Sequence, residues 1–193
     1  MSYKEIRVPF ERNLRDMSKE ELKRYFRWFI DVIPERINEL ARAVRSTSGF
    51  EEWQPDYTPA SLDALGEWFA GEAELRQLNV KEIQTHRDHL PWWIEAPTED
   101  LTSRTSSLGI DVGIYLSQVL LGNHPSIRWE QPMGSKKYAE YGWPVLTGLS
   151  GLHFNPMRIG DVIARKFARK ANKQLRDVYD IWAEKTERTP NKL

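Results

Sequence analysis

Asp111 is the residue with the clearest chemical potential, because it lies in an otherwise apolar stretch that predicts a buried helix over residues 99–121. Ser107 and Arg104 stand about one and two helical turns before it. Burial raises the pKa of a carboxyl group, which makes Asp111 a candidate general acid or base. An ion pair with an arginine, or a cap on a neighbouring helix, explains the same residue without chemistry. We favour this second interpretation, since structural ion pairs perturb carboxyl groups as well.

Two histidines, His86 and His89, follow Glu82 at spacings that place all three on one face of a helix. Imidazole nitrogens and a carboxylate are zinc ligands. Metalloprotease helices, however, place their histidines four residues apart around a catalytic glutamate, and structural zinc sites use four ligands. A solvated polar helix explains the same residues, so we predict no metal site and no cofactor.

Nucleophilic catalysis and nucleotide hydrolysis lack their sequence signatures. No G-x-S-x-G elbow is present, and Gly134-Ser135-Lys136-Lys137 lacks the strand and helix that flank a P-loop. One enzyme hypothesis remains, a carboxylate–histidine site formed by Asp111, His124 and His153. We assign no catalytic residue and keep this site as an alternative.

Formal charge is balanced, with 28 basic and 28 acidic residues, so general attraction to nucleic acid or to an anionic membrane is not indicated. The charges are unevenly distributed along the chain. Residues 51–100 hold twelve acidic and three basic residues, whereas residues 156–176 hold seven basic residues and one acidic residue. The two regions face either each other or separate partners.

Basic residues of the second region recur at four- and seven-residue spacings, which predicts a charged stripe beside the apolar face of a helix. The stripe consists of Arg158, Arg165, Arg169 and Lys173. Such a stripe can contact phosphates, but no helix-turn-helix, zinc-finger or RNP motif accompanies it. A solvated face, or docking against the acidic region, explains it better, so nucleic acid is not the expected partner.

Eight tryptophans are many for 193 residues, and several fall in expected loops. Loop tryptophans are either buried plugs or anchors of an interface. Acidic residues surround these tryptophans, which favours a surface that steers a basic protein partner. The predicted partner-binding residues are Glu51, Glu52, Trp53, Asp56, Trp92 and Trp93.

Hydrophobic spacing and cap signals outline the first half of the chain. A capping box at Ser18 opens a helix to about residue 32, and Pro34 opens a second helix that the Ser46-Thr47-Ser48-Gly49 run ends. Thr58-Pro59 opens a third helix to about residue 78. Residues 79–97 are ambiguous, and their end is expected to form a connector packed by Trp92 and Trp93.

The second half begins with the apolar helix, in which Gly109 and Gly113 predict the close approach of another backbone. Short extended pieces predict a small antiparallel sheet, and Asn155-Pro156 opens a long helix to about residue 184. The predicted fold class is α+β, mainly helical, with the small sheet between a central apolar helix and a long C-terminal helix. We expect a single domain over residues 1–193, with a helical acidic half (1–97) and a second half (98–193).

Cysteine is absent, which excludes disulfides and cysteine-ligated metals and fits a reducing cytoplasm. The N-terminal residues lack the apolar core of a secretory signal, and the apolar run of residues 108–121 is too short to span a membrane. We therefore predict a cytoplasmic protein with no membrane partner.

The apolar helix also carries a family resemblance. The stretch Gly113-Ile114-Tyr115-Leu116-Ser117-Gln118-Val119, then Gly122 and a strand with Trp129, resembles a group of uncharacterised bacterial proteins with a G-x-Y-L-x-x-V helix followed by a Trp-bearing strand. The match covers about residues 101–170, and Ser117 and Gln118 replace a small residue and a glutamate of that group. The resemblance implies a bacterial, cytoplasmic α+β domain of unknown function, sometimes encoded near toxin–immunity genes.

Together these observations favour a non-enzymatic bacterial protein-binding factor, most concretely an immunity- or antitoxin-type inhibitor that blocks a basic partner through residues 51–100. The alternatives are the carboxylate–histidine enzyme and a nucleic-acid-associated accessory protein.

Overall fold

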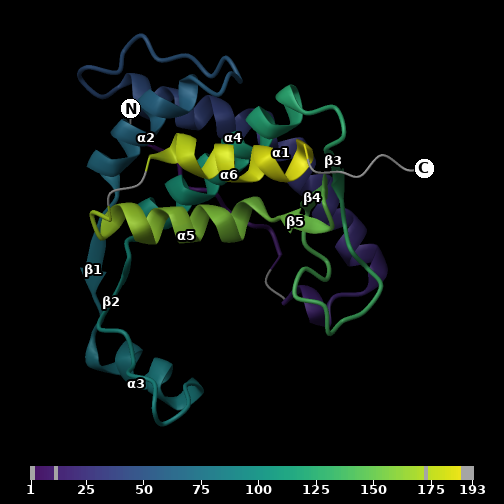
Figure 1. Cartoon of the computed structure of the whole chain (residues 1–193). Coiled ribbons are helices and arrows are strands. Elements are labelled where there is room, and N and C mark those ends of the chain that lie inside the picture. The colour runs from purple at the N-terminus through teal and green to yellow at the C-terminus, as the bar shows by residue number, and fades with distance from the viewer. Residues whose placement is uncertain (1–2, 11–12, 172–173, 188–193) are drawn as a thin grey trace.

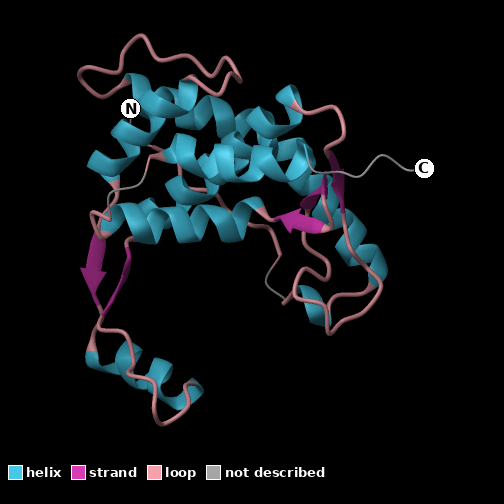
Figure 2. Cartoon of the chain, viewed as in Figure 1, coloured by secondary structure: helices cyan, strands magenta, loops and turns pink. Residues whose placement is uncertain are grey.

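The computed structural model describes residues 3–10, 13–171 and 174–187, and it confirms a mainly helical α+β fold (Figure 2). A short 3₁₀ turn at Leu14–Asp16 precedes the first helix. The helices are α1 (Lys19–Arg45), α2 (Ser61–Glu72), α3 (Val80–His89), α4 (Ser103–Asn123), α5 (Pro156–Ala168) and α6 (Leu175–Glu187). The strands are β1 (Leu75–Gln77), β2 (Glu99–Leu101), β3 (Arg128–Glu130), β4 (Val145–Leu149) and β5 (Leu152–Phe154).

Helix α4 is the centre of the fold, and the other helices of the body pack around it (Figure 1). Its residues from Thr105 to Leu120 are buried on nearly every face, as the apolar sequence predicts. Thr102 caps its first turn by accepting a hydrogen bond from the Thr105 amide. The helix ends at Asn123, and its C-cap His124 is extended because proline, here Pro125, disfavours helical conformation in the residue before it.

The backbones of α4 and α5 touch each other through glycines, which confirms the predicted close approach. A Cβ atom on Gly113 would lie 2.1 Å from the Pro156 carbonyl oxygen, and one on Gly160 would lie 2.2 Å from the Gly109 carbonyl oxygen. Real Cβ atoms do not approach oxygen so closely, so only glycine fits at these positions. The cost of glycine in a helix interior, about 1 kcal/mol each, is offset by the packing that this approach permits.

Helix α1 is continuous from Lys19 to Arg45, and Pro34 lies inside it, so the expected break into two helices is wrong. The predicted capping box is confirmed, since the Ser18 amide donates to Glu21 and the Glu21 amide donates to Ser18 Oγ. Proline removes only one helix hydrogen bond. Buried residues on both sides of it, such as Phe29 and Ile37, keep one face of the helix against the core.

The expected long C-terminal helix is two helices, α5 and α6, which run in opposite directions (Figure 1). Lys170 adopts a left-handed conformation with φ of 54°. Its amide donates to Phe167 and the Ala171 amide donates to Lys166, the two hydrogen bonds of a Schellman C-terminal cap. Because glycine usually fills this position, the continuous apolar pattern concealed the turn.

The small antiparallel sheet is confirmed, with the strand order β3-β4-β5. Trp129 of β3 lies opposite Leu146 of β4, and the inner residues of β4 are buried against the core. A second sheet, the two-stranded pair β1-β2, was not predicted. It follows α2, which ends at Glu72 rather than near residue 78, and it encloses α3, where the sequence was ambiguous. Among the described helices, none combines the length and the hydropathy that a membrane span requires.

The glycine contact predicts opposite effects for two alanine substitutions on α4. Gly113→Ala places a methyl group against the Pro156 carbonyl, and we expect it to lower the free energy of unfolding by about 1–3 kcal/mol or more. Gly122→Ala meets no atom within 4 Å, so better helix propensity should leave stability equal or raise it by up to about 1 kcal/mol. Thermal unfolding of both variants checks this, and equal melting temperatures would contradict the close packing.

Candidate functional site

Residues 75–101 form an arm that projects from the body (Figure 1). Its stem is the antiparallel pair β1-β2, in which Arg76 lies opposite Asp100 and Gln77 opposite Glu99. Helix α3 and the loop that returns from it make up the outer part. No residue of α3 is buried, so tertiary packing against the body does not stabilise this helix.

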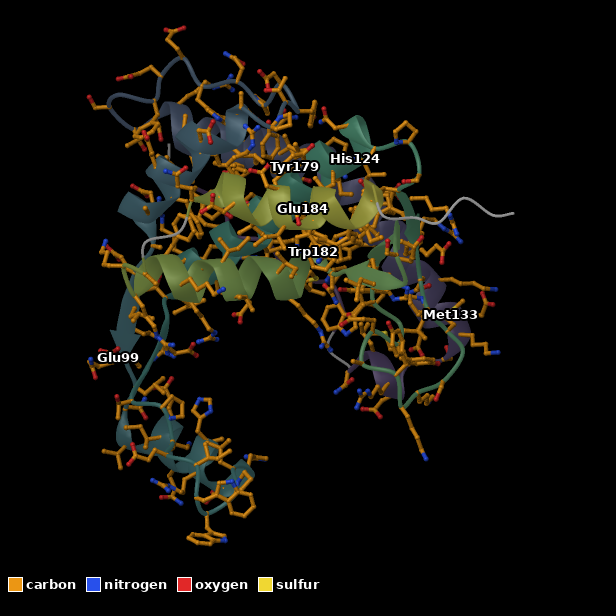
Figure 3. All side chains as sticks on the ribbon, viewed as in Figure 1. Glu99, His124, Met133, Tyr179, Trp182 and Glu184 are labelled. Carbon is orange, nitrogen blue, oxygen red and sulfur yellow. The ribbon has the colours of Figure 1, made fainter. Side chains whose placement is uncertain are left out.

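The base of the arm is fixed to the body by specific contacts. Leu101 is buried, and the Glu74 amide donates to Thr105 Oγ1 in the first turn of α4. Arg165 of α5 donates to the Asp100 carboxylate at 2.8 Å, and its guanidinium lowers the pKa of that carboxyl against the opposing effect of burial. Figure 3 shows Glu99 on this stem, far from His124 at the other end of α4. The arm therefore leaves the body in a defined direction.

Capping and charge pairing hold α3 together in the absence of burial. Asn79 and Glu82 form a reciprocal capping box at its start. Arg76 of the stem donates two hydrogen bonds, of 2.7 and 3.1 Å, to the Glu82 carboxylate. These bonds, first that of Arg76 and then that of the Asn79 amide, lower the pKa of Glu82 to about 2. Glu82 thus joins the stem to the helix, and it is a structural residue of the arm.

The outer end of the arm is apolar and exposed to solvent. Trp92 is 86% exposed and Trp93 is 69% exposed, and their rings meet edge to face at 5.7 Å. The described residues include all eight tryptophans of the chain, and these two alone are exposed. Val80 and Ile94 are further exposed apolar residues of the arm. The expectation of a connector packed by its tryptophans is wrong, because the body offers them no surface.

Trp53, the third predicted contact tryptophan, is a core residue. It is 7% exposed, its indole N–H donates to the Ser61 carbonyl, and its ring packs edge to face on Tyr115. This burial removes Trp53 from the set of residues that a partner can touch. Its neighbours Glu51, Glu52 and Asp56 are exposed, although Glu51 accepts from the Gly49 amide and Asp56 accepts from Thr58.

The two parts of the predicted partner surface lie at opposite ends of the molecule. The loop of residues 46–60 lies beyond α2 at the top of Figure 1, whereas the arm extends from the bottom. Glu51 and Glu52 therefore do not share one contact surface with Trp92 and Trp93.

The acidic and basic regions pair in part within the chain. Arg165 binds Asp161 as well as Asp100, and Arg176 lies 3.7 Å from Asp63. In the predicted phosphate-contact stripe, Arg158 pairs with Glu140, and Arg169 is exposed at the end of α5. Lys173 lies outside the described residues. Two of the three described members are thus already neutralised.

Asp111 belongs to a buried polar network between α1, α4 and the N-terminal segment. Arg36 donates two hydrogen bonds to its carboxylate, of 2.8 and 2.7 Å, and the Tyr3 hydroxyl donates a third. Burial raises the pKa of Asp111 to about 6, while the bonds from Arg36 and Tyr3 act against this rise. The guanidinium of Arg36, held on both carboxylate oxygens, favours the ionised form of Asp111. The network agrees with the ion-pair interpretation of Asp111.

The structure does not bring Asp111, His124 and His153 together. Asp111 and His124 are separated along α4 by about 20 Å. His124 lies at hydrogen-bond distance from Tyr179 and Thr186, and His153 lies at 2.8 Å from the Tyr138 hydroxyl. Each group thus has partners of its own. Among the described residues, no cluster of three or more potential metal ligands is present, and Glu82 is occupied by Arg76 rather than by the histidines.

Several hollows on the body were not foreseen, and two of them have volumes near 600 Å³. One, of about 590 Å³, is polar, and its charged side chains pair as Arg42 with Glu39 and Arg104 with Glu72. The other hollow, called the groove from here on, is apolar, has a volume of about 600 Å³ and lies between α1, the end of α4 and β3. Its walls include Ile30, Ile33, Tyr57, Leu121, Gly122 and Trp129. Pro34 also lines this groove, and no other feature of the sequence indicates it.

Comparison with protein-family models, with curated proteins and with solved structures finds no match for this chain. The resemblance to the bacterial group therefore stays a prediction, and the functional argument depends on the arm and the body themselves.

Glu82 provides a test of how the arm is held. Its lowered pKa means that its interactions stabilise the arm above pH 4.5 and are lost as the pH falls towards 2. Glu82→Gln removes the charge at neutral pH, so hydrogen exchange of the α3 amides should accelerate while α4 amides keep their protection. Asp88→Asn, on the exposed side of α3, is the control and should change little. Unaltered protection of α3 in the Glu82 variant would contradict this account.

Asp111 provides a test of the buried network. Asp111→Asn leaves the Arg36 guanidinium buried without a countercharge, and we expect a loss of about 3–5 kcal/mol in the free energy of unfolding. Asp161→Asn removes a half-exposed partner of Arg165 and should cost no more than about 1 kcal/mol. Denaturant titration of both variants measures the difference, and similar midpoints would argue against a structural role for Asp111.

Proposed function

We propose that this chain is a non-enzymatic protein-binding factor whose contact element is the arm. The observation that carries the proposal is the exposure of Trp92 and Trp93 at the end of a helix that buries no residue. Tryptophan is enriched among the residues that dominate binding energy at protein interfaces. Large exposed apolar patches on folded proteins mark interaction sites.

The charge of the arm favours a protein over a lipid surface or a nucleic acid. Its basic residues are Arg76, Lys81 and Arg87, and its acidic residues are Glu82, Asp88, Glu95, Glu99 and Asp100. An excess of acidic residues is repelled by anionic lipid and by phosphates. The polar network around Asp111 is occupied by structural contacts, which supports a binding role over a catalytic one.

A second candidate function is the immunity- or antitoxin-type inhibitor of a basic partner. The exposed acidic loop with Glu51, Glu52 and Asp56 favours it, as does the resemblance of α4 and β3 to the bacterial group. Its contact surface would be this loop, and charge attraction would dominate its affinity.

Affinity capture from a lysate of the source cell, at low and at high salt, tests the two candidates. With the arm as contact element, Trp92→Ala/Trp93→Ala should reduce partner recovery more than about tenfold at both salt concentrations, because truncation of an interface anchor costs 2 kcal/mol or more. Val162→Ala/Ile181→Ala removes exposed apolar side chains of the body and serves as the control.

Each candidate function predicts a different result of this capture experiment. Equal recovery by the tryptophan variant and the wild type would overturn the arm proposal. A partner lost at high salt, and lost again on neutralising Glu51, Glu52 and Asp56, would establish the second candidate. Recovery of nucleic acid, falling steeply with salt, would favour the accessory protein that uses Arg158, Arg165 and Arg169.

A further inference from the structure

We infer that the body carries a binding site for para-substituted phenols, and that the tyrosine of the chain's own N-terminal segment occupies this site as a displaceable ligand. The segment, residues 3–8, is called the strap. The site beneath it is called the socket, and it is formed by Arg36, Glu39, Ser107 and Asp111. Strap and socket both lie outside the arm, so this site is independent of the contact element proposed above.

Three socket side chains contact the hydroxyl of Tyr3. The hydroxyl donates to the Asp111 carboxylate, accepts from the Arg36 guanidinium at 2.9 Å and lies 2.9 Å from Ser107 Oγ. Burial and the charge of Asp111 raise the pKa of Tyr3, so the hydroxyl keeps the proton that it donates. A neutral hydroxyl that both donates and accepts therefore fits the socket, whereas an anionic group has no proton to donate to Asp111.

The aromatic ring of Tyr3 is contacted as well as its hydroxyl. The guanidinium carbons of Arg36 and Arg104 lie 5.5 and 5.9 Å from the ring centroid. Cations at such distances are attracted by the quadrupole of an aromatic ring. The ring contacts disfavour an aliphatic alcohol. The hydroxyl contacts disfavour a phenyl group, because a missing hydroxyl leaves buried polar atoms without a partner.

The strap has the character of a bound ligand rather than of a core element. It forms no helix or strand, and four of its six residues are exposed. The Lys4 amide donates to Glu39, and the Lys4 carbonyl accepts from Arg36. The Ile6 amide donates to Ser107 Oγ at 2.8 Å. A segment held in this way, with few buried apolar contacts, opens at a lower free energy than the core.

The socket consists of charged groups whose burial is costly. Arg36, Glu39 and Asp111 are 2%, 4% and 0% exposed. Apolar packing would hold a purely structural segment as well or better, so this polar chemistry points to recognition. Glu39 and Tyr3 also line the polar hollow of about 590 Å³. Departure of Tyr3 therefore joins the socket to this hollow, and the joined space has room for a ligand larger than a phenol.

Hydrogen exchange of the wild-type chain, measured by NMR where closing outpaces exchange, tests displacement without any substitution. The Lys4 and Ile6 amides, which donate to socket side chains, report the opening of the strap. We expect about 10 mM p-cresol to accelerate their exchange about tenfold, because a ligand that binds the open socket with a dissociation constant of about 1 mM raises the open population by this factor. The α4 amides should keep their protection. o-Cresol, whose methyl group lies beside the hydroxyl, is the control and should have no effect.

Two peptides distinguish a tyrosine in a polypeptide from a free phenol as the source of the ligand. The acetylated peptide of residues 3–8 offers the phenol and the backbone groups of the strap, and its Tyr3→Phe counterpart lacks only the hydroxyl. Acceleration by the first peptide at a concentration at least about tenfold below that of p-cresol assigns the site to a tyrosine in an extended segment. Equal potency assigns it to a small phenol.

Calorimetric titration with p-cresol measures the affinity directly. Tyr3→Ala empties the socket and should bind p-cresol at least about tenfold more tightly than the wild type, in which the strap competes. In the Tyr3→Ala background, Ser107→Ala removes a partner of the hydroxyl and should weaken binding about tenfold. Ser106→Ala, at the neighbouring serine outside the socket, is the control and should not.

Several results would overturn the inference. One is exchange of the Lys4 and Ile6 amides only through global unfolding, since the strap then does not open. Another is exchange that neither p-cresol nor the peptide of residues 3–8 accelerates. A third is an equal effect of p-cresol and o-cresol, or of the two peptides, which would mean a general effect on the chain. A Tyr3→Ala variant that keeps its α4 protection but binds p-cresol no more tightly than the wild type would also overturn it. Exchange in the wild type decides even where Tyr3→Ala fails to fold.

Discussion

The direct contact between the backbones of α4 and α5 is the constraint on which the rest of this structure depends. Gly109, Gly113 and Gly160 let the two helices approach until carbonyl oxygens occupy the space of missing side chains. This approach positions Arg165 of α5 beside the stem, where it holds Asp100. It also leaves other faces of α4 to α1 and α6. One close pair of helices thus organises both the core and the base of the arm.

The buried network around Asp111 fixes a different part of the same helix. Arg36 and Tyr3 bring α1 and the N-terminal segment onto α4 through directional bonds rather than through apolar packing alone. Removing two charges from water is costly unless every donor and acceptor is satisfied. No described buried side-chain polar atom lacks a partner. This network, in which every donor and acceptor has a partner, therefore fixes how the N-terminal segment lies across the body. The Asp111 carboxylate stabilises this arrangement.

The features that sequence predicted here are those governed by neighbours along the chain. The capping box at Ser18, the all-round apolar α4 and the glycine approach depend on local pattern, and the structure confirms them. Pro34 and Lys170 were misjudged because tertiary packing tolerates a proline inside α1 and a left-handed lysine after α5.

The tryptophans were misjudged for a related reason. Trp53 and Trp92 both lie in loops beside acidic residues, and only the fold decides that one fills the core while the other has no surface to cover it. The groove could not be predicted because its walls come from elements distant in sequence, and the arm could not because no local pattern shows that residues 75–77 pair with residues 99–101.

The distribution of polar and apolar groups is the reason for proposing that this molecule binds a partner rather than catalyses a reaction. The groups capable of proton transfer, at Asp111, His124 and His153, lie apart and each contacts its own structural partners. Trp92 and Trp93, the most exposed aromatic side chains of the described residues, lie at the end of an arm that carries five acidic and three basic residues. Affinity at such a surface comes from the removal of apolar area from water, which depends weakly on salt. The body holds the stem of the arm but covers no residue of α3, so the outer part of the arm would gain further stability when another surface covers its tip. Under the proposed function, a partner that covers the tip would suppress the local unfolding of α3, which otherwise depends on its capping box and on Arg76.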